Sequence, residues 1–146
     1  MKILCMEDQE DKYQHINSVL RQHGITQIFW EKNCQTGLMR LLKKDIDYLL
    51  LDMSMPLSDV DYKKESFDSF AGLAVLQEIK RKKYTIKVII VTGFNDFEKG
   101  KKIITLDELE SEIKQKYKDC YVGYIKYDST SIEWQQKLIQ ILSGGD

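Results

Sequence analysis

Polar side chains stand at the ends of four short apolar runs of the chain, and their types suit one chemistry. The first run ends in Glu7 and Asp8, the next in Asp52, and the last two in Thr92 and Lys126. Open α/β sheets bind ligands beyond the carboxyl ends of their strands, so we expect these groups to share one edge of a sheet. A single polar residue at a strand end is common, but three carboxylates, a hydroxyl and an ammonium together indicate a site.

These groups suit phosphoryl chemistry assisted by a metal ion. Clustered carboxylates repel one another unless a cation lies among them, and an all-oxygen site suits Mg²⁺, with Mn²⁺ possible. The carboxylate of Asp52 can attack phosphorus and form an acyl phosphate. A metal ion and the Lys126 ammonium would offset charge on the phosphoryl oxygens, and the Thr92 hydroxyl could hydrogen-bond the same group.

The elements that position these groups alternate along the chain. Short apolar runs predict strands over Ile3–Met6, Gln27–Glu31, Tyr48–Met53, Lys87–Val91 and Tyr121–Ile125. Apolar residues at helical spacing predict a helix after each strand. The first of these helices is expected from about Asp11 to His23, and Gly24 is a suitable residue to end it.

Several helix starts are marked by capping residues. Asn33 is a predicted N-cap, and two capping boxes, Thr105 with Glu108 and Thr130 with Glu133, precede the last two helices. The β-α order recurs five times, with strands apolar on both faces, which predicts a parallel sheet covered by helices on both sides. With right-handed crossovers, the fold class is α/β, a three-layer α/β/α sandwich around a five-stranded parallel sheet.

The bulk composition indicates one globular domain, since the 146 residues are 42% hydrophobic and 31% charged. We expect this domain over residues 1–142 and a flexible tail over 143–146. With 22 basic and 23 acidic residues, the chain gives no reason to expect nucleic acid or an anionic membrane as a partner. The spacing of Cys5, Cys34 and Cys120 suggests neither a disulfide framework nor a zinc site. A cytoplasmic location fits, because neither a signal peptide nor a membrane-spanning run is found.

Five short motifs in order connect these features to one family: "ILCMED", "LLLDMSMP", "AGLAVLQEIK", "VIIVTG" and "YIK". On these motifs the chain resembles, over nearly its whole length, the receiver domain of bacterial response regulators in two-component signalling. The resemblance implies a flavodoxin-like fold with the strand order 2-1-3-4-5. It also implies signalling by a shift between two conformations, which a phosphoryl group biases.

The resemblance implies that Asp52 is the phosphoacceptor. Glu7 and Asp8 would hold Mg²⁺ together with Asp52 and the backbone carbonyl of Ser54. The phosphodonor would be a phosphohistidine on a histidine kinase or on a histidine phosphotransfer protein. Receivers of this family catalyse their own phosphorylation and, more slowly, the hydrolysis of the product, and a downstream protein target would read the phosphorylated state.

The resemblance gives roles to the remaining groups as well. Thr92 would bind the phosphoryl group and report its presence, and Lys126 would form an ion pair with the acceptor aspartate or with its phosphoryl group. The aromatic switch position of the family, three residues before the lysine, holds Gly123 here. Tyr124 or Tyr121 would have to take that role through a shift of register.

The chain departs from the family pattern in other places. Two stretches are longer than usual, at about 57–71 beside the acceptor and at about 94–118 after Thr92, and either could contact a partner. Tyr127 follows the lysine where the family usually has proline, so a cis peptide bond is not expected there. Ser54 and Phe94 occupy the positions that often tune the lifetime of the phosphoryl group in the family.

Three functions remain open on the sequence. The leading one is a stand-alone receiver that relays a phosphoryl group or binds partners according to its phosphorylation. The second is a pseudo-receiver, a protein-interaction module without phosphotransfer. The third, a phosphatase of the haloacid-dehalogenase type, is disfavoured because that family needs an aspartate two residues after the nucleophile, where this chain has Ser54. The sequence identifies neither the oligomeric state nor further domains of a longer protein.

Overall fold

The computed structural model describes residues 1–55, 71–93, 96–99 and 102–144. The longer stretch expected at about 57–71 therefore lies outside the described residues apart from Ala71, and so does Phe94. Within the described part of the chain, no helix is both long and apolar enough to cross a membrane.

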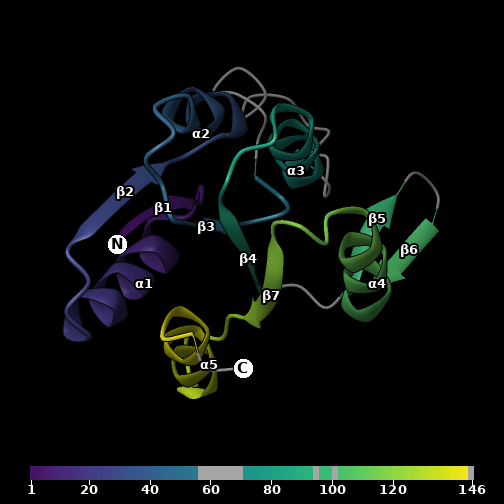
Figure 1. The fold of residues 1–146 in the computed structure, drawn as a ribbon. Helices are drawn as coiled ribbons and strands as arrows, with labels where there is room; N and C mark the ends of the chain where they lie inside the picture. Colours follow the sequence, from purple (N-terminus) through teal and green to yellow (C-terminus); the bar gives the residue numbers. More distant parts are fainter. Residues whose placement is uncertain (56–70, 94–95, 100–101, 145–146) are drawn as a thin grey trace.

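Five strands form one parallel sheet at the centre of the molecule (Figure 1). They are β1 (Lys2–Met6), β2 (Gln27–Glu31), β3 (Tyr48–Leu51), β4 (Lys87–Thr92) and β7 (Tyr121–Lys126). Their order in space is β2-β1-β3-β4-β7. Counted along the chain within this sheet, that order is 2-1-3-4-5, so the predicted topology is confirmed.

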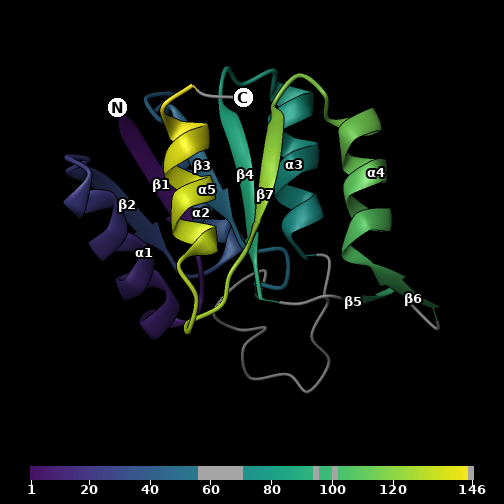
Figure 2. The same cartoon turned by 90° about the horizontal axis from the view of Figure 1, so that it is seen from below.

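In the described part of the chain, five helices cover the two faces of the sheet (Figures 1 and 2). They are α1 (Glu10–Gln22), α2 (Cys34–Leu41), α3 (Ala71–Lys82), α4 (Leu106–Lys116) and α5 (Glu133–Leu142). Buried side chains of α1 and α5 pack together on one face, and those of α2, α3 and α4 pack together on the other. The predicted three-layer sandwich is confirmed.

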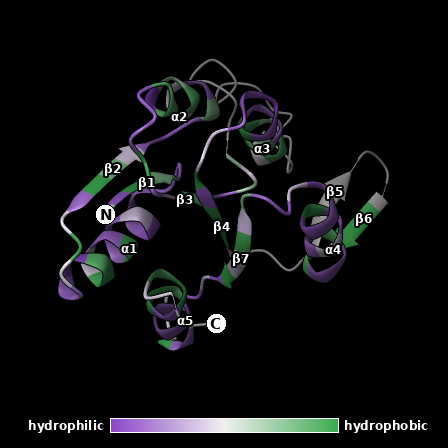
Figure 3. Cartoon of the chain, viewed as in Figure 1, coloured by the Kyte–Doolittle hydropathy of each residue, from purple (hydrophilic) through white to green (hydrophobic). Residues whose placement is uncertain are grey.

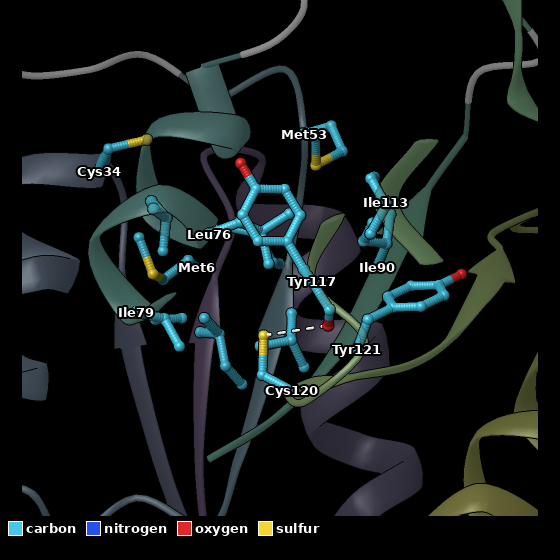
Figure 4. Close-up of a cluster of buried hydrophobic side chains, with 14 of the residues drawn as sticks. Met6, Cys34, Met53, Leu76, Ile79, Ile90, Ile113, Tyr117, Cys120 and Tyr121 are labelled. Carbon is cyan, nitrogen blue, oxygen red and sulfur yellow. Dashed lines mark hydrogen bonds between the residues drawn. The ribbon is translucent and has the colours of Figure 1, made fainter. Parts of the chain in front are cut away.

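The central strands are buried on both faces because most of their residues are apolar. Figure 3 shows hydrophobic stretches, in green, along the sheet strands. All of the residues of β3 are buried. On the face under α3, Met6 and Ile90 from two strands meet Leu76 and Ile79 of the helix (Figure 4). Such continuous apolar runs are typical of a parallel sheet covered on both sides.

The register of the strands fixes where the polar residues leave the sheet. Met6 at the end of β1 pairs with Leu51 at the end of β3, and Leu51 pairs with Ile90 of β4. At the next pair of strands, Thr92 pairs with Lys126. The residues that follow β1 and β3 therefore leave the sheet at the same level, close to the carboxyl ends of β4 and β7.

Two further strands form a separate antiparallel hairpin, β5 (Asp96–Lys99) with β6 (Lys102–Thr105). Figure 2 shows this hairpin at the same end of the molecule as the carboxyl ends of the sheet strands. The prediction of five strands was therefore incomplete. Strands of four residues show too few alternations for the sequence pattern to distinguish them from a charged loop.

Two of the predicted helix caps are confirmed. The Oδ1 of Asn33 accepts a hydrogen bond from the N–H of Thr36 over 2.9 Å at the start of α2. The Oγ1 of Thr105 accepts one from the N–H of Glu108 over 3.2 Å at the start of α4. Each bond satisfies a backbone donor that the first turn of the helix leaves unpaired.

The capping box predicted for Thr130 and Glu133 is wrong. Helix α5 begins only at Glu133, and its N-cap, Ile132, makes no side-chain capping bond. The hydroxyl of Thr130 instead donates to Oδ1 of Asp128 over 2.8 Å. A carboxylate two residues away offers the hydroxyl a stronger acceptor, so the polar pattern belongs to the preceding turn rather than to the helix.

An irregularity in β7 changes which side chains face α4. The successive residues Val88 and Ile89 of β4 pair with Tyr121 and Gly123, so β7 carries one extra residue there. A bulge of this kind moves the following residues to the opposite face. Both Tyr121 and Tyr124 consequently pack on the face that α2, α3 and α4 cover.

Candidate functional site

Three carboxylates gather at the carboxyl edge of the sheet. Glu7 and Asp8 follow β1 and Asp52 follows β3, and these two strands are neighbours (Figure 1). One oxygen of each carboxylate lies within 4.8 Å of one oxygen of each of the others. Glu7 is 1% exposed and Asp52 is 5% exposed, while Asp8 is half-buried. The structure thus brings together the acidic residues that the sequence placed at one edge.

Asp52 is held by the turn that follows it. Its Oδ1 accepts hydrogen bonds from the backbone N–H and from the hydroxyl of Ser54, both over 3.1 Å. Its own N–H donates to the carbonyl oxygen of Met6 over 3.1 Å. Helix α3 packs closely on the same turn, since the N–H of Gly72 donates to the carbonyl oxygen of Met53 over 2.9 Å. β3 ends at Leu51, so this turn rather than the strand fixes the carboxylate.

Glu7 is held through both of its carboxylate oxygens and through its main chain. Oε1 pairs with the ammonium of Lys12 over 2.7 Å, and Oε2 accepts a hydrogen bond from the N–H of Gln9 over 3.1 Å. The indole N–H of Trp30 donates to the carbonyl oxygen of Glu7 over 2.7 Å. The Trp30 ring in turn stacks on the ring of Tyr13, with the ring centres 4.1 Å apart.

Lys12 also contacts this cluster, although it was not among the site residues predicted from the sequence. Its side chain is only 6% exposed, and its Nζ lies 2.7 Å from Oε1 of Glu7, 3.0 Å from the carbonyl oxygen of Val91 and 4.0 Å from Oδ2 of Asp52. One sequence signal could have identified it. Lys12 stands four residues before Ile16, on the buried stripe of α1, where a lysine needs an acidic partner.

Burial and the charge of Asp52 shift the pKa values of its neighbours in the cluster. Burial, together with the neighbouring charge of Asp52, raises the pKa of Glu7 to about 8 despite the ion pair with Lys12. Burial and Asp52 also raise the pKa of Asp8. For Lys12, burial lowers the pKa, but the charges of Asp52 and Glu7 outweigh it, so the net shift is upward. The cluster therefore favours a proton or a further cation over three free negative charges.

The donor set fits a hard divalent cation. Three carboxylate oxygens within 4.8 Å of one another could coordinate one ion. Oxygen ligands of this kind are those that Mg²⁺ prefers, and Mg²⁺ commonly keeps several of its own waters. Asp8 is half-buried, so one side of the cluster remains accessible to solvent.

Comparison with known proteins agrees with this geometry. The model of the response regulator receiver domain matches residues 3–115. The chain belongs to the response regulator receiver family. Receivers of this family accept phosphoryl groups from histidine kinases and act on downstream targets.

Relatives of this receiver include proteins of similar length. The Detocs response regulatory protein DtcB of Enterobacter cloacae is 29% identical over 150 residues, which cover 96% of this chain and 97% of the relative. The uncharacterized protein y4jR of Sinorhizobium fredii is 29% identical over 92 residues, and the match spans 61% of each chain. The response regulator TrrA of Thermotoga maritima, solved in complex with Mg²⁺ and BeF, shares the fold. Its TM-score is 0.63 at 22% identity, over 97% of this chain and 99% of that one.

The other two predicted site residues of this receiver lie at the ends of β4 and β7. Thr92 is fully buried and pairs in register with Lys126. The ammonium of Lys126 donates to the carbonyl oxygen of Gly93 over 2.7 Å, and it makes no ion pair with Asp52 among the described interactions. The predicted ion pair between Lys126 and the unphosphorylated acceptor is therefore not formed in this structure, because the nearer carbonyl takes the ammonium.

The two candidate switch tyrosines have different environments. The hydroxyl of Tyr121 donates to Oε2 of Glu110 over 2.5 Å, and burial raises the pKa of this tyrosine. The ring of Tyr124 is half-buried and lies 4.2 Å from the ammonium of Lys137. Tyr121 thus contacts α4 directly, whereas Tyr124 packs against the apolar cluster that includes residues of α4 and also contacts α5 through Lys137.

Tyr127, which stands where the family usually has proline, anchors α5 to the site. No peptide bond of the described residues is cis, which agrees with the prediction for this position. The N–H of Tyr127 donates to the carbonyl oxygen of Thr92 over 2.7 Å, and its hydroxyl lies 3.0 Å from Nδ1 of His15. The ring centre of Trp134 lies 5.0 Å from those of both Tyr127 and His15. The tyrosine thus joins α1, the end of β4 and α5 through an aromatic cluster.

Proposed function

We propose that this receiver accepts a phosphoryl group on Asp52 from a phosphohistidine, on a histidine kinase or a histidine phosphotransfer protein. The observation that supports this function is the convergence of Glu7, Asp8 and Asp52 within 4.8 Å at the carboxyl edge of the sheet. Asp52 stands on a turn that two hydrogen bonds from Ser54 and the close approach of α3 make rigid. A fixed carboxylate beside a cation site is what phosphoryl transfer requires of the protein.

In the transfer, an oxygen of the Asp52 carboxylate attacks phosphorus and forms an O–P bond. The N–P bond of the phosphohistidine breaks, and its electron pair returns to the imidazole nitrogen, which then takes up a proton. Hydrolysis removes the phosphoryl group from Asp52. The oxygen of water bonds to phosphorus, and the O–P bond to Asp52 breaks. The products are the carboxylate, inorganic phosphate and a proton.

Glu7, Asp8, Asp52 and the backbone carbonyl of Ser54 would hold one Mg²⁺, or Mn²⁺, in this site. The bound ion supplies positive charge to the phosphoryl oxygens. The complex of the relative TrrA with Mg²⁺ and BeF supports this assignment, since its fold matches this receiver over 97% of the chain. The donor set, which consists of carboxylate oxygens, supports it independently.

The remaining site residues would act on the phosphoryl group once it is bound. The Thr92 hydroxyl would donate a hydrogen bond to it, and Lys126 would leave the carbonyl of Gly93 to pair with it. Movement of Thr92 would be transmitted to α4 through Tyr124 or Tyr121, which pack in or against the apolar cluster that includes residues of α4. We propose a single receiver unit over residues 1–142, acting in the cytoplasm, that relays the phosphoryl group or binds a protein target in its phosphorylated state.

One observation favours the alternative of a pseudo-receiver without phosphotransfer. The ammonium of Lys126 is held by Gly93 rather than by Asp52, so the predicted partner of the phosphoryl group is directed elsewhere. Asp52 and the two other carboxylates are nevertheless present and gathered, and a module that only binds partners has no need of them. The two functions are separated by a direct test of phosphorylation.

The test is to incubate the protein with Mg²⁺ and a small acyl phosphate, and to measure its intact mass beside that of Asp52→Asn. Asparagine keeps an Oδ1 that can accept both hydrogen bonds from Ser54, so the variant should fold. We expect one added phosphoryl group in the wild type, none in the variant, and none after chelation of the metal. If neither the acyl phosphate nor a phosphohistidine donor adds a phosphoryl group, the pseudo-receiver function replaces this one.

A further inference from the structure

Lys12 contacts the acidic cluster at Glu7 and Asp52, although nothing in the family motifs assigns it a role. Its ammonium has three N–H donors. Two of them are used by Oε1 of Glu7 at 2.7 Å and by the carbonyl oxygen of Val91 at 3.0 Å. Oδ2 of Asp52 lies 4.0 Å away, so the third donor has the acceptor aspartate as its neighbour. The side chain is 6% exposed and reaches the cluster from α1, on the interior side of the site.

We propose that the Lys12 ammonium is a second cation of the phosphoacceptor site, in addition to the metal ion. It pairs with Glu7 and places a fixed positive charge beside Asp52. The inference rests on the proposed function, and it makes Lys12 a positioning residue rather than a catalytic one. Its consequence is that the site divides its charge between the ammonium and one divalent ion, with Asp8 and Asp52 as the stronger ligands of that ion.

The charges of the cluster support this division. In the metal-loaded site, where the ion takes the place of the proton on Glu7, the three ionised carboxylates carry three negative charges, and Lys12 balances one of them. The remaining two match one divalent ion, so the loaded pocket is close to neutral before a phosphoryl group arrives. Without Lys12, a carboxylate would stay unbalanced beside the incoming phosphoryl oxygens, and like charges at such short distances repel strongly in a buried site.

The contacts of Glu7 also support a weaker role for it as a metal ligand. Both of its carboxylate oxygens already have partners, since Lys12 takes Oε1 and the N–H of Gln9 takes Oε2. A metal ion at Glu7 would have to share an oxygen with the ammonium. In this structure the ammonium near the acceptor aspartate is that of Lys12, while the ammonium of Lys126 donates to the carbonyl oxygen of Gly93.

The test compares the wild type with Lys12→Met, which removes the charge but keeps a long apolar side chain. The control is Lys118→Met, which removes the same charge from an exposed position. Lys118 precedes the amino-terminal end of β7, whereas the acidic cluster lies at the carboxyl ends of the strands. Binding of Mg²⁺ is measured by calorimetry without any phosphodonor. The rate of phosphorylation at saturating Mg²⁺ is measured separately.

We expect opposite effects on the two quantities. Lys12→Met should bind Mg²⁺ roughly tenfold more tightly, because a positive charge next to the ion is lost and Glu7 is released to bind it. The same variant should be phosphorylated roughly tenfold more slowly at saturating Mg²⁺, because the charge beside Asp52 is missing. Lys118→Met should match the wild type in both. A merely structural lysine would weaken Mg²⁺ binding or leave it unchanged, and that result would overturn the proposal.

A second pair of variants covers the case in which the buried, unpaired Glu7 prevents Lys12→Met from folding. Glu7→Gln is compared with the double variant Glu7→Gln and Lys12→Met, in which the ion pair is removed as a unit. The double variant should bind Mg²⁺ several-fold more tightly than Glu7→Gln, and equal affinities would contradict the inference. Failure of the wild type to take up any phosphoryl group would instead overturn the proposed function, while the Mg²⁺ titrations would still decide whether Lys12 is a cation of the site.

Discussion

Trp30 donates its indole N–H to the carbonyl oxygen of Glu7 over 2.7 Å, so a fluorescent side chain is hydrogen-bonded to the main chain of the acidic cluster. The only other tryptophan of the chain is Trp134. Its ring nitrogen is buried and has no hydrogen-bond partner among the described residues, so replacement by phenylalanine loses no such bond. Trp134→Phe is therefore a suitable background in which Trp30 reports on the site alone.

In the Trp134→Phe background, we expect Mg²⁺ to change the emission of Trp30 in a saturable way. The physical reason is that an ion at the cluster alters the field and the position of the Glu7 backbone that the indole contacts. The emission should return to its starting value with a chelator, and Asp52→Asn should weaken the response. An emission that ignores Mg²⁺ up to millimolar concentrations would contradict a cation site next to Glu7.

The stability of the metal-free receiver should fall as the pH rises. Folding raises the pKa of Glu7 from 4.5 to about 8, so the folded state binds this proton more tightly than the unfolded state. The stabilisation is complete below the unfolded value and is lost as the pH rises through the folded value. From about pH 5 to about pH 8 we expect a loss on the order of 2 to 4 kcal/mol in a chelator.

Urea unfolding at several pH values, in a chelator and in Mg²⁺, checks this prediction. Mg²⁺ should restore most of the loss above about pH 7, because it binds the ionised carboxylates in place of the proton. Glu7→Gln should flatten the dependence in the chelator. A stability that rises between these pH values in the chelator would show that the carboxyl group does not retain its proton in the folded state.

Gly72→Ala should destabilise the receiver and disturb the acceptor turn. A Cβ at Gly72 would lie 2.9 Å from Cα of Met53 and 3.2 Å from the carbonyl oxygen of Asp52, and backbone atoms cannot move aside cheaply. We expect a loss of roughly 1 to 3 kcal/mol in the free energy of unfolding, measured in urea, together with slower phosphorylation of Asp52.

Gly37→Ala is the matched control for this helix position. The nearest atoms to a Cβ there would be Cε, Sδ and Cγ of the buried Met6 side chain, and this flexible side chain, rather than backbone, would have to move. Alanine also gains roughly 1 kcal/mol over glycine within a helix such as α2. Gly37→Ala should therefore cost clearly less than Gly72→Ala, and an equal cost at both positions would contradict the close packing of α3 on the acceptor turn.

Two threonines with the same sequence pattern should respond differently to alanine. Thr105→Ala removes the hydrogen bond to the N–H of Glu108 and should cost about 1 kcal/mol of stability. Thr130→Ala removes only a contact with Asp128 outside α5 and should cost much less. Thermal unfolding of both variants measures the difference. A larger loss for Thr130→Ala would mean that this residue does cap α5 in solution.

The parallel sheet and the location of its site follow from the residue pattern along the chain. Continuous apolar runs such as the one before Asp52 can be buried only between two layers of helices, and parallel strands bring their carboxyl ends to one edge. For that reason the gathering of Glu7, Asp8 and Asp52 could be predicted without any structure. The caps at Asn33 and Thr105 could be predicted as well, because they depend on residues only three positions apart.

The partners of the charged groups, in contrast, depend on how the elements pack against one another. Lys12, on the buried face of α1, meets Glu7 and Asp52, which follow two different strands. Lys126 takes the carbonyl of Gly93 instead of pairing with Asp52. The bulge in β7 and the hairpin of β5 and β6 depend likewise on pairing between strands. A sequence pattern records what each residue prefers along its own element. Which cation lies beside Asp52 is set by distances between elements, and these exist only once the layers have packed.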